Sequence, residues 1–404
     1  MSNSRTELRK VSIHEGILRI GDVIHSLEMH VLRTEESLGS VLAVSKKAMI
    51  KNPRFANSQV DGYALGTPAS NELTYSIIGD SYAGRGFLGE LRNGEAVKVR
   101  TGAPVPSNCK SIVMQEDVEI FDGELHLKQS PIPHENIRRA GADFDHGMII
   151  AKELTMINPR VLGVLVAAGV ETVTCYRKPQ VKIIATGDEI CPLGEKLNEA
   201  QIYDSTSPMV QALLKDWGVN CEVVRVGDSL QLLEQVIKNS SDVDFLAIIG
   251  GASVGDRDFT AEALINCGFC AEFSKVKMRP GMPTSFFSQQ NRVALSVPGN
   301  PVSAYVAMLV FGRHIVDCFQ GKSKVSIEME CAILSHPVQK LPGHAQFMRG
   351  RFGLDREPNQ KTVSLNEGQG SHLLLGLSQA DCLVFLPEEC TFMDAGAVVS
   401  IVKL

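Results

Sequence analysis

Residues 245–258 read Phe245-Leu246-Ala247-Ile248-Ile249-Gly250-Gly251-Ala252-Ser253-Val254-Gly255-Asp256-Arg257-Asp258, an apolar run that ends in a glycine-rich, acidic loop. Five consecutive apolar residues of this kind are typical of a strand buried on both faces. Glycines directly after such a strand let the backbone approach a ligand closely. The loop has neither P-loop nor dinucleotide-binding spacing, so its sequence alone does not identify the ligand.

The same order of strand, loop and helix recurs on both sides of this stretch. Further buried-strand runs lie at residues 181–185, 221–226 and 293–297. Signals for a helix start follow two of them, at Asp228-Ser229-Leu230-Gln231 and at Pro298-Gly299-Asn300-Pro301. Strands that alternate with helices predict a doubly wound, parallel α/β sheet covered on both faces.

The segments outside this region are predicted to be richer in strands. Between about residues 55 and 130 the pattern becomes β-like, and Asp122-Gly123 separates two short alternating runs, which predicts a hairpin. From about residue 326 to the end, short strands return.

Two further helices are marked by their caps. Ser12 and Glu15 have the spacing of a capping box ahead of an amphipathic run. Asn158 and Pro159 are typical of the cap and first position of a helix, which should end before Gly169.

Length and composition limit the possible classes. At 404 residues the chain exceeds one hydrophobic core, so two to four domains are expected. A net charge of -6 argues against a chain-wide nucleic-acid-binding role, which needs a basic stripe. No N-terminal signal region or stretch of about 20 apolar residues is evident, so we expect a cytoplasmic protein without a membrane partner.

The 10 cysteines show no framework spacing, which favours reduced thiols. Cys267 and Cys270 form a lone CxxC pair. Because a structural zinc needs four ligands and no second pair is present, we favour core thiols over metal or redox use.

Small or charged residues follow four of the predicted strands, at Gly187-Asp188-Glu189, at Asp228, in the glycine-rich loop and at residues 298–301. Ligands of doubly wound sheets bind beyond the carboxyl ends of the strands, so these segments should share one rim of the sheet. The carboxylates there would repel a phosphate unless a cation intervened, and oxygen ligands beside phosphate suit Mg²⁺. They are Glu189, Asp228, Asp256 and Asp258.

Cations are available for an oxyanion. Lys275, Lys277 and Arg279 share one face of an extended segment by the two-residue period. Each feature has a structural alternative: Asp228 and Asn300 are good helix caps, and the basic row could be a solvated strand face.

Taken together, these segments resemble the molybdopterin molybdotransferase family, which includes MoeA and the E domain of gephyrin. Eight segments match in order, from about residue 10 to the end: Asn57-Ser58-Gln59-Val60-Asp61-Gly62-Tyr63-Ala64, Arg100-Thr101-Gly102-Ala103-Pro104-Val105-Pro106, Glu135-Asn136-Ile137-Arg138-Arg139 with Gly141 and Asp143, Thr186-Gly187-Asp188-Glu189, Ile202-Tyr203-Asp204-Ser205, the glycine-rich loop, Pro298-Gly299-Asn300-Pro301-Val302-Ser303-Ala304, and Gly368-Gln369-Gly370-Ser371-His372 preceded by Arg349-Gly350.

The resemblance implies a multidomain α/β fold around a doubly wound, MogA-like domain. Its divisions would be residues 1–45 with 141–176 as an elongated linking domain of helix and strands, 46–140 as a β-rich domain, 177–325 as the α/β substrate domain and 326–404 as a C-terminal β domain. It further implies a homodimer with the active site between subunits, so that Asp61 and Thr101 reach the ligand from the partner's β-rich domain.

The implied activity is insertion of molybdenum from molybdate into adenylated molybdopterin, with Mg²⁺-dependent release of AMP, in molybdenum cofactor biosynthesis. The resemblance assigns catalytic roles to Asp61, Glu189, Asp228, Asp258, Lys275 and Arg279, with Asp258 and Glu189 at the metal. It assigns substrate binding to Thr101, Arg138, Asp143, Gly250, Gly251, Ser253, Gly255, Pro298, Gly299, Asn300, Pro301, Arg349, Ser371 and His372. Within these sets, Lys275, Arg279, Pro298, Arg349 and Ser371 would define the molybdate pocket.

The sequence departs from the family pattern at several positions. Arg279 replaces the usual Lys before Pro-Gly, so a planar fork replaces a point charge. Thr206 stands where Asn is usual, Gln59-Val60 replaces Ala-Met, and Ala252 replaces Val. A catalytically weak molybdopterin-binding or scaffold paralogue is therefore an alternative, and an adenylyltransferase acting on molybdopterin is another.

Overall fold

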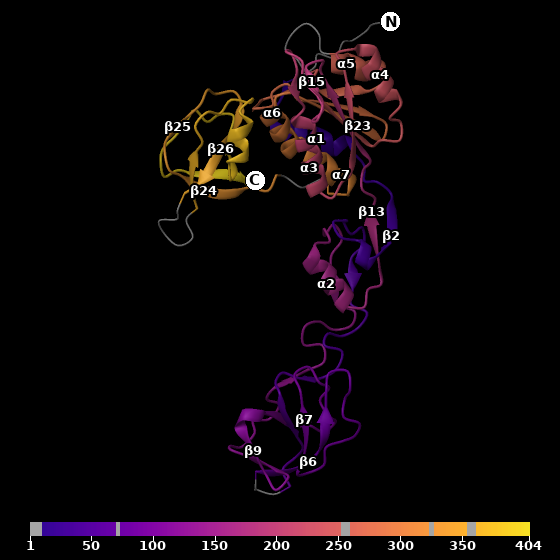
Figure 1. The fold of residues 1–404 in the computed structure, drawn as a ribbon, viewed down its shortest axis with the longest axis vertical. Coiled ribbons are helices and arrows are strands. Elements are labelled where there is room, and N and C mark those ends of the chain that lie inside the picture. The colour runs from indigo at the N-terminus through magenta and orange to yellow at the C-terminus, as the bar shows by residue number, and fades with distance from the viewer. Residues whose placement is uncertain (1–9, 70–72, 252–258, 323–326, 354–360) are drawn as a thin grey trace. The chain divides into compact units, whose positions relative to one another are not determined.

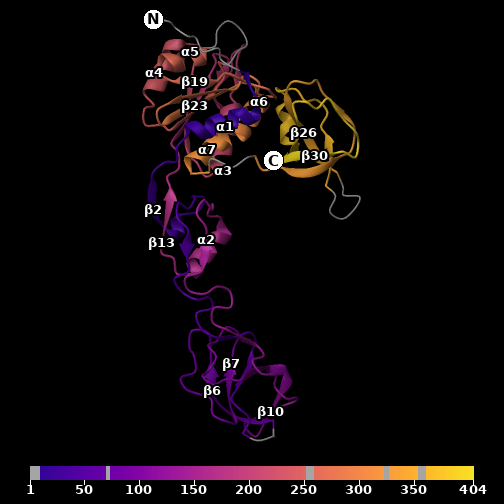
Figure 2. The same ribbon diagram turned by 180° about the vertical axis from the view of Figure 1, so that it is seen from behind.

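The computed structural model describes residues 10–69, 73–251, 259–322, 327–353 and 361–404 (Figures 1 and 2). The chain divides into two compact units, residues 1–30 with 176–404 and residues 31–175. The first unit carries the α/β region and the C-terminal strands. The second carries the β-rich region and a small helical region.

The α/β region is built on a six-stranded sheet in the order β17-β14-β18-β23-β22-β19. Four of its strands are parallel neighbours at the predicted places: β14 (Val181–Thr186), β17 (Cys221–Val226), β18 (Phe245–Ile249) and β23 (Arg292–Val297). The purely parallel sheet that we expected is wrong at one edge, where β22 (Ser285–Gln289) and β19 (Cys270–Phe273) run antiparallel. Because β22 and β23 are joined by the two-residue turn Gln290-Asn291, no crossover helix separates them.

Helices cover both faces of this sheet. Alternate strand residues point to opposite sides, and because apolar residues occupy both sides of the strands, both faces must be buried. Ile183 and Leu295 pack into one core and Ile184 and Ala294 into the other, all with 0% exposure. Full burial of an isoleucine or leucine side chain contributes roughly 1.5–3 kcal/mol. The helices on the first face are α1 (Ile13–Val23), α3 (Thr206–Asp216), α6 (Pro301–Ala307) and α7 (Arg313–Phe319), and those on the second are α4 (Leu230–Lys238) and α5 (Phe259–Asn266).

One helix of this region passes a simple test for a membrane span. Over Pro301–Phe319, α6, a π-helical turn and α7 form a continuous helix that is long and apolar enough by length and composition. The expectation that no stretch approaches this length was therefore wrong. Of its most apolar window, 83% is buried inside the fold, which is typical of a core helix.

The cap of α1 is the predicted one, and that of α4 differs from the prediction by one residue. The Ser12 hydroxyl accepts from the Glu15 N–H at 3.2 Å and the Glu15 carboxylate accepts from the Ser12 N–H at 2.9 Å, so the capping box is confirmed. At α4 the cap is the Ser229 hydroxyl, which accepts from the Leu232 N–H at 3.3 Å. The capping alternative for Asp228 was wrong by one residue.

The C-terminal strands form a closed sheet in the order β21-β26-β27-β24-β30-β28, since β26 also pairs with β28. One of these strands, β21 (Met278–Arg279), comes from the α/β region and places Arg279 opposite Gln346. The others are β24 (Glu330–Leu334), β26 (Ala345–Phe352), β27 (Thr362–Leu365), β28 (Cys382–Leu386) and β30 (Val398–Lys403). Shorter elements complete the unit: β1 (Lys10–Val11), β15 (Ile190–Cys191), β16 (Ile202–Tyr203), β20 (Lys275–Val276), β25 (Val338–Gln339), α8 (Leu374–Ser378) and β29 (Phe392–Met393).

The second unit contains a six-stranded sheet in the order β8-β5-β7-β6-β10-β9. Its strands are β5 (Gly62–Leu65), β6 (Thr74–Ser81), β7 (Glu95–Val99), β8 (Ser111–Met114), β9 (Val118–Phe121) and β10 (Glu124–Leu127). The predicted hairpin is confirmed: Asp122 and Gly123 join β9 to β10 with φ of 52° and 82°, as its tight turn requires.

A separate hydrophobic core lies around α2 (Pro159–Ala167), whose predicted cap is confirmed because the Asn158 side chain accepts from two backbone N–H groups. The short strands of this unit and its ends are β2 (Met29–Arg33), β3 (Lys46–Lys47), β4 (Asn57–Ser58), β11 (Ile137–Arg138), β12 (Ile149–Ala151) and β13 (Thr172–Tyr176). The four-domain division remains a prediction.

All ten cysteines are free. Burial raises the pKa of the Cys109 thiol to about 11 and that of Cys318 to about 12, so both are neutral at physiological pH. In the CxxC pair, the Cys267 thiol donates to the Glu234 carbonyl at 3.7 Å and Cys270 is exposed.

Candidate active site

Three strand ends of the α/β sheet meet at the predicted rim. Gly250, which follows β18, has a φ of 91°, and a Cβ there would lie 2.6 Å from the Thr186 carbonyl oxygen at the end of β14. Only glycine fits both constraints. A Cβ on Gly299, beyond β23, would lie 3.7 Å from the Gly250 Cα. The shared rim is thus confirmed for these loops.

Part of the glycine-rich loop lies outside the described residues. Gly251 is described and has a φ of 68°, and a Cβ there would lie 2.3 Å from the position of the Thr260 hydroxyl oxygen. The assigned residues Ser253, Gly255 and Asp258, and the rim carboxylate Asp256, belong to 252–258, which the structure does not describe.

The rim carboxylates fall into two kinds. Asp188 is engaged, because its carboxylate accepts from the Asp228 N–H at 3.1 Å and so ties the loop after β14 to the loop after β17. Glu189 and Asp228 are exposed, and a Cβ on Gly187 would collide with the Glu189 carboxylate, which folds back over it.

These donors fit one kind of magnesium site. In the described part of the chain, no three His, Cys, Asp or Glu side chains gather closely enough to hold a metal by themselves. Mg²⁺ usually keeps several waters and binds through one or two carboxylates with substrate phosphate. Glu189 at the rim suits an ion that arrives with a phosphate, not a closed protein cage.

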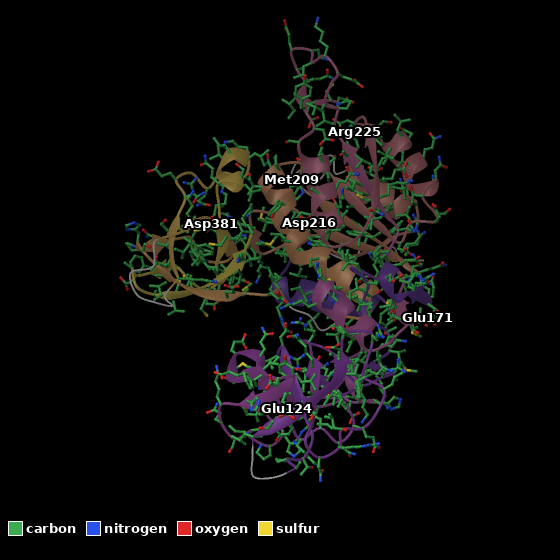
Figure 3. All side chains as sticks on the ribbon, turned by 60° about the horizontal axis from the view of Figure 1, so that its bottom comes forward. Glu124, Glu171, Met209, Asp216, Arg225 and Asp381 are labelled. Atoms are coloured by element: carbon green, nitrogen blue, oxygen red, sulfur yellow. The ribbon has the colours of Figure 1, made fainter. Side chains whose placement is uncertain are left out.

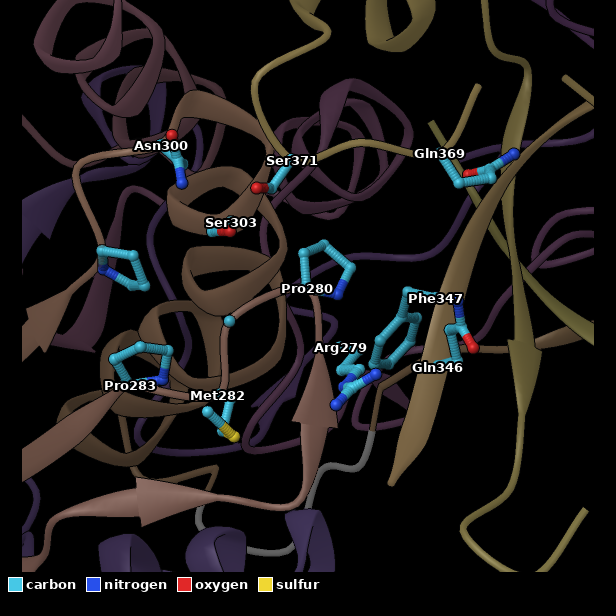
Figure 4. A pocket seen from close by; sticks show the side chains of 12 residues that line it. Arg279, Pro280, Met282, Pro283, Asn300, Ser303, Gln346, Phe347, Gln369 and Ser371 are labelled. Carbon is cyan, nitrogen blue, oxygen red and sulfur yellow. The ribbon is translucent and has the colours of Figure 1, made fainter. Parts of the chain in front are cut away.

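A pocket of about 330 Å³ opens beside the rim, where the α/β region meets the C-terminal sheet (Figure 4). Its described lining holds one cation, Arg279, and no carboxylate. Hydroxyl and amide groups of Ser371, Ser303 and Asn300 contribute to its polar surface. The remaining lining residues are Pro280, Gly281, Met282, Pro283, Pro298, Gln346, Phe347 and Gln369.

Arg279 is held at the pocket by backbone pairing, and its side chain is exposed. More cations lie nearby: the Lys10 ammonium is 2.7 Å from the His344 Nε2. Burial, then the charges of Lys10 and Arg279, lower the pKa of His344, which keeps this ring neutral and able to accept from the ammonium.

The predicted basic row has the expected alternation, but its three side chains do not act together at the pocket. Lys275, Lys277 and Arg279 alternate with the buried Val276 and Met278, as the two-residue period required. Lys277 is ion-paired to Glu388 at 2.8 Å. Lys275 is exposed on β20 and is not part of the pocket lining, so Arg279 alone of the three contributes to it.

Arg349 lies behind the pocket wall with 1% exposure. Its Nη1 donates to the Leu373 carbonyl at 2.9 Å, and its Nη2 donates to those of Gly368 at 2.8 Å and Gly370 at 3.1 Å. The guanidinium has no carboxylate partner among the described residues, and burial lowers its pKa. In this structure Arg349 therefore orders the loop that carries Ser371, while His372 is exposed and outside the lining.

The start of α6 forms another part of the wall. Asn300 occupies the cap position and Pro301 the first turn, yet the Asn300 side chain makes no capping hydrogen bond. The capping alternative for this side chain was therefore wrong, and its amide faces the pocket instead. The Val302 N–H donates to the Ser371 carbonyl at 3.2 Å and joins α6 to the C-terminal loop.

One matched segment proves to be structural. The Asp204 carboxylate is buried and accepts from the Ser207 N–H at 2.9 Å and from the Arg225 Nε at 2.8 Å. It thereby satisfies a backbone N–H in the first turn of α3. Arg225 is labelled in the α/β region in Figure 3. Thr206, which replaces the family's Asn, donates its hydroxyl to the Gly299 carbonyl at 3.3 Å and so supports the rim.

In the second unit, Asp61 and Thr101 contact each other directly. The Asp61 Oδ1 accepts from the Thr101 N–H at 2.8 Å and its hydroxyl at 3.0 Å, and Oδ2 accepts from Arg100 at 3.1 Å. These bonds, the Thr101 N–H first, lower the pKa of Asp61. Arg138 lies exposed on β11, paired with β4, and Asp143 accepts from the Asn52 amide at 2.9 Å.

Some pocket residues carried no usable signal in the sequence. Gln346 and Phe347 lie on β26 and reach the pocket only because β21 pairs with that strand. Ser303 and Gln369 lay inside matched segments, but nothing in their spacing singled them out. Met282 and Pro283 follow the Arg279-Pro280-Gly281 segment, which gave the nearest clue.

Comparison with known proteins covers nearly the whole chain. The MoeA N-terminal region (domain I and II) matches residues 10–169, the probable molybdopterin binding domain matches residues 182–317, and the MoeA C-terminal region (domain IV) matches residues 332–404. The molybdopterin molybdenumtransferase of Haemophilus influenzae is 32% identical over 377 residues, 92% of each chain. That of Staphylococcus epidermidis is 27% identical over 402 residues, 97% of this chain and 95% of the relative.

Solved structures agree on the fold. The molybdopterin biosynthesis MoeA protein of Pyrococcus horikoshii superposes with a TM-score of 0.79 at 22% identity, covering 98% of this chain and 100% of that one. A second structure of a MoeA protein from the same source gives 0.76 at 24% identity. With three matching regions in order and a relative 32% identical over 92% of both chains, this chain belongs to the molybdopterin molybdenumtransferase (MoeA) family.

Proposed function

We propose that this chain is a molybdopterin molybdenumtransferase, which inserts molybdenum from molybdate into adenylated molybdopterin and releases AMP in a Mg²⁺-dependent reaction. The observation that carries the proposal is the pocket of Arg279 and Ser371, whose described lining holds a cation and neutral donors but no carboxylate. In a chain of net charge -6, such a lining selects for an anion. Molybdate is a tetrahedral oxyanion that requires fixed donors of this kind.

The rim would bind the adenylate part of the substrate. Gly250, Gly251 and Gly299 let the rim loops pack closely together, and Pro298 and Asn300 belong both to the rim loop and to the pocket. Glu189, together with Asp258, would hold Mg²⁺, which would supply positive charge to the phosphate that leaves as AMP. Asp228 supports this edge through its contact with Asp188.

The decisive experiment is a turnover assay. Purified protein is incubated with adenylated molybdopterin, molybdate and Mg²⁺, and AMP and active cofactor are both measured. Molybdate-dependent release of AMP with cofactor formation is expected, and EDTA should stop it until excess Mg²⁺ is added. Tight pterin binding without turnover would instead identify a catalytically weak paralogue.

Asp258→Ala provides a matched test of the metal assignment. It should lose Mg²⁺-dependent turnover and keep pterin binding, because the pterin is held by other residues of the site. Undiminished turnover would contradict the assigned role.

We also infer a homodimer in the cytoplasm, with the active site shared between subunits. Exposed apolar side chains lie near the end of α2 in the second unit: Met49 and Ile50 lie against Gly169, and the Ala48 N–H donates to the carbonyl of the exposed Met148 at 2.8 Å. Apolar side chains left exposed close together support an interface. The ten free thiols suit a reducing compartment.

Complementation tests the shared site. Asp61→Asn and Asp258→Ala should each be inactive alone. If each site takes Asp61 from one subunit and Asp258 from the other, randomly mixed dimers hold one intact site in four, so about a quarter of wild-type activity should return. No recovery after subunit exchange, checked by ultracentrifugation, would place both residues in one subunit.

A further inference from the structure

The loop that carries Ser371 is fixed by an unusual contact with strand β26. The ladder between β26 and β27 pairs Gly350 with Leu365, and beyond Leu365 the chain turns away. The Arg349 carbonyl still accepts from the N–H of Asn366, the first residue past β27, at 2.9 Å, but no residue of β27 pairs with the Arg349 N–H. Buried backbone groups need partners, so this gap must be closed.

The side-chain amide of Gln369 closes it. The Arg349 N–H donates to the Gln369 Oε1 at 2.9 Å, and the Gln369 Nε2 donates to the Arg349 carbonyl at 3.0 Å. The same nitrogen donates to the Asn366 carbonyl at 3.0 Å. The amide thus supplies the acceptor that a strand carbonyl would give the Arg349 N–H, and it binds both ends of the turn.

Gln369 also lines the pocket, but it has no donor left for a ligand. A primary amide has two N–H donors, and both are used inside the protein. Its role at the pocket must therefore be indirect. Ser371, two residues further, has no side-chain hydrogen bond among the described residues and lines the same pocket.

The loop is held from its other side as well. The Arg349 guanidinium binds the carbonyls of Gly368, Gly370 and Leu373, and the α6 N-terminus binds the Ser371 carbonyl. Gln369 fixes the backbone from which this guanidinium extends, so one amide controls both the buried cation and the loop. A displaced loop would move the Ser371 hydroxyl away from the pocket.

We propose that Gln369 is a positioning residue of the oxyanion pocket, which clamps Arg349 and Asn366 and so fixes the Ser371 hydroxyl for molybdate. This inference rests on the proposed function for the identity of the ligand. It assigns Gln369 no contact with molybdate.

The test is calorimetric binding of molybdate alone, followed by turnover. Gln369→Met keeps the side-chain length and removes the amide without adding charge. We expect molybdate affinity to fall about tenfold, at the lower end of what loss of a supporting outer partner costs at comparable sites. The KM for molybdate should rise by a similar factor, while kcat at saturating molybdate stays near the wild-type value.

Gln379→Met is the matched control, because Gln379 is an exposed glutamine of the same region whose side chain makes no hydrogen bond among the described residues. It should bind molybdate like the wild type. Gln369→Asn keeps the amide but is one methylene too short to span both partners, so it should show a smaller loss in the same direction. It also keeps the test informative if Gln369→Met does not fold.

A double-mutant cycle with Ser371→Ala separates positioning from general stability. If Gln369 acts through Ser371, the loss from Ser371→Ala should largely vanish in the Gln369→Met background. Additive losses, or folded Gln369 variants with unchanged affinity, would overturn the proposal. If the wild type binds molybdate and releases no AMP, the proposed activity fails while the positioning role stands. If the wild type turns over normally and the Gln369 variants bind molybdate as it does, the proposed activity stands and the positioning role fails.

Discussion

The Thr101 N–H and hydroxyl both donate to one oxygen of Asp61, at 2.8 and 3.0 Å, so the backbone and side chain of one residue hold a carboxylate assigned to catalysis. Arg100 binds the other oxygen. A carboxylate with this many donors stays ionised well into the acid range. Its geometry is set by bonds within the second unit.

Thr101→Val removes the hydroxyl and keeps the backbone donor. The pKa of Asp61, which is lowered chiefly by Thr101, should therefore rise toward its ordinary value of 3.8. This can be measured by NMR titration of protein with ¹³C-labelled aspartate. A carboxyl with a lowered folded pKa adds stability above its unfolded pKa and loses it as the pH falls through the folded value. Below about pH 4 the wild type should lose stability more steeply than the variant.

Arg349 should be far less tolerant of substitution than an exposed arginine. Arg349→Met leaves the carbonyls of Gly368, Gly370 and Leu373 without their donors. Since each unpaired buried group costs about 1–3 kcal/mol and some will recruit water, we expect a loss of about 2–4 kcal/mol in unfolding free energy. Denaturant titration measures it. Arg349→Lys can bind only some of these carbonyls, so its unfolding free energy should lie between those of the wild type and Arg349→Met. Equal stability of the wild type and both variants would contradict this account.

The sequence was informative where chemistry is local. The turn at Asp122-Gly123 and the caps at Ser12 and Asn158 depend on residues a few positions apart, so their patterns were sufficient. The strand ends at Thr186 and Gly250 were also foreseeable, because parallel strands bring their carboxyl ends to one rim.

The sequence could not show what depends on pairing between distant segments. Gln346 faces Arg279 because a two-residue strand of the α/β region joins the C-terminal sheet, and no periodicity records that register. The burial of Arg349 and the use of Gln369 as a strand substitute likewise depend on where β27 ends. The resemblance to a family located these segments without giving these contacts.

The Asp204–Arg225 pair should contribute to stability and not to catalysis. Asp204 is 7% exposed, and its replacement by Ala removes both the acceptor of the Ser207 N–H in α3 and the ion-pair partner of Arg225. Arg225 is partly solvated, so we expect a loss of about 2–3 kcal/mol, below the full cost of a fully buried pair. Unfolding in urea measures this, and turnover at a temperature where the variant is folded should be near normal. A large loss of kcat in folded protein would assign Asp204 to the chemistry instead.

Arg279 should control affinity for the oxyanion more strongly than any other exposed cation near the pocket. Its guanidinium is exposed at the wall, whereas Lys277 is paired with Glu388 and Lys275 lies outside the lining. A hydrogen bond between charged groups is worth about 1.5–3 kcal/mol, so Arg279→Ala should raise the KM for molybdate roughly ten- to a hundredfold. Lys215→Ala, which removes an exposed cation of α3 outside the lining, is the matched control and should change it little. Arg279→Lys restores the family's residue and keeps the charge but not the two-pronged geometry, so its KM for molybdate should lie between those of the wild type and Arg279→Ala.

Molybdate titrations at two ionic strengths would show whether Arg279 acts through long-range charge, which salt screens, or through direct contact, which salt screens far less. If Arg279→Ala and Lys215→Ala behave alike, the pocket does not bind the oxyanion through Arg279.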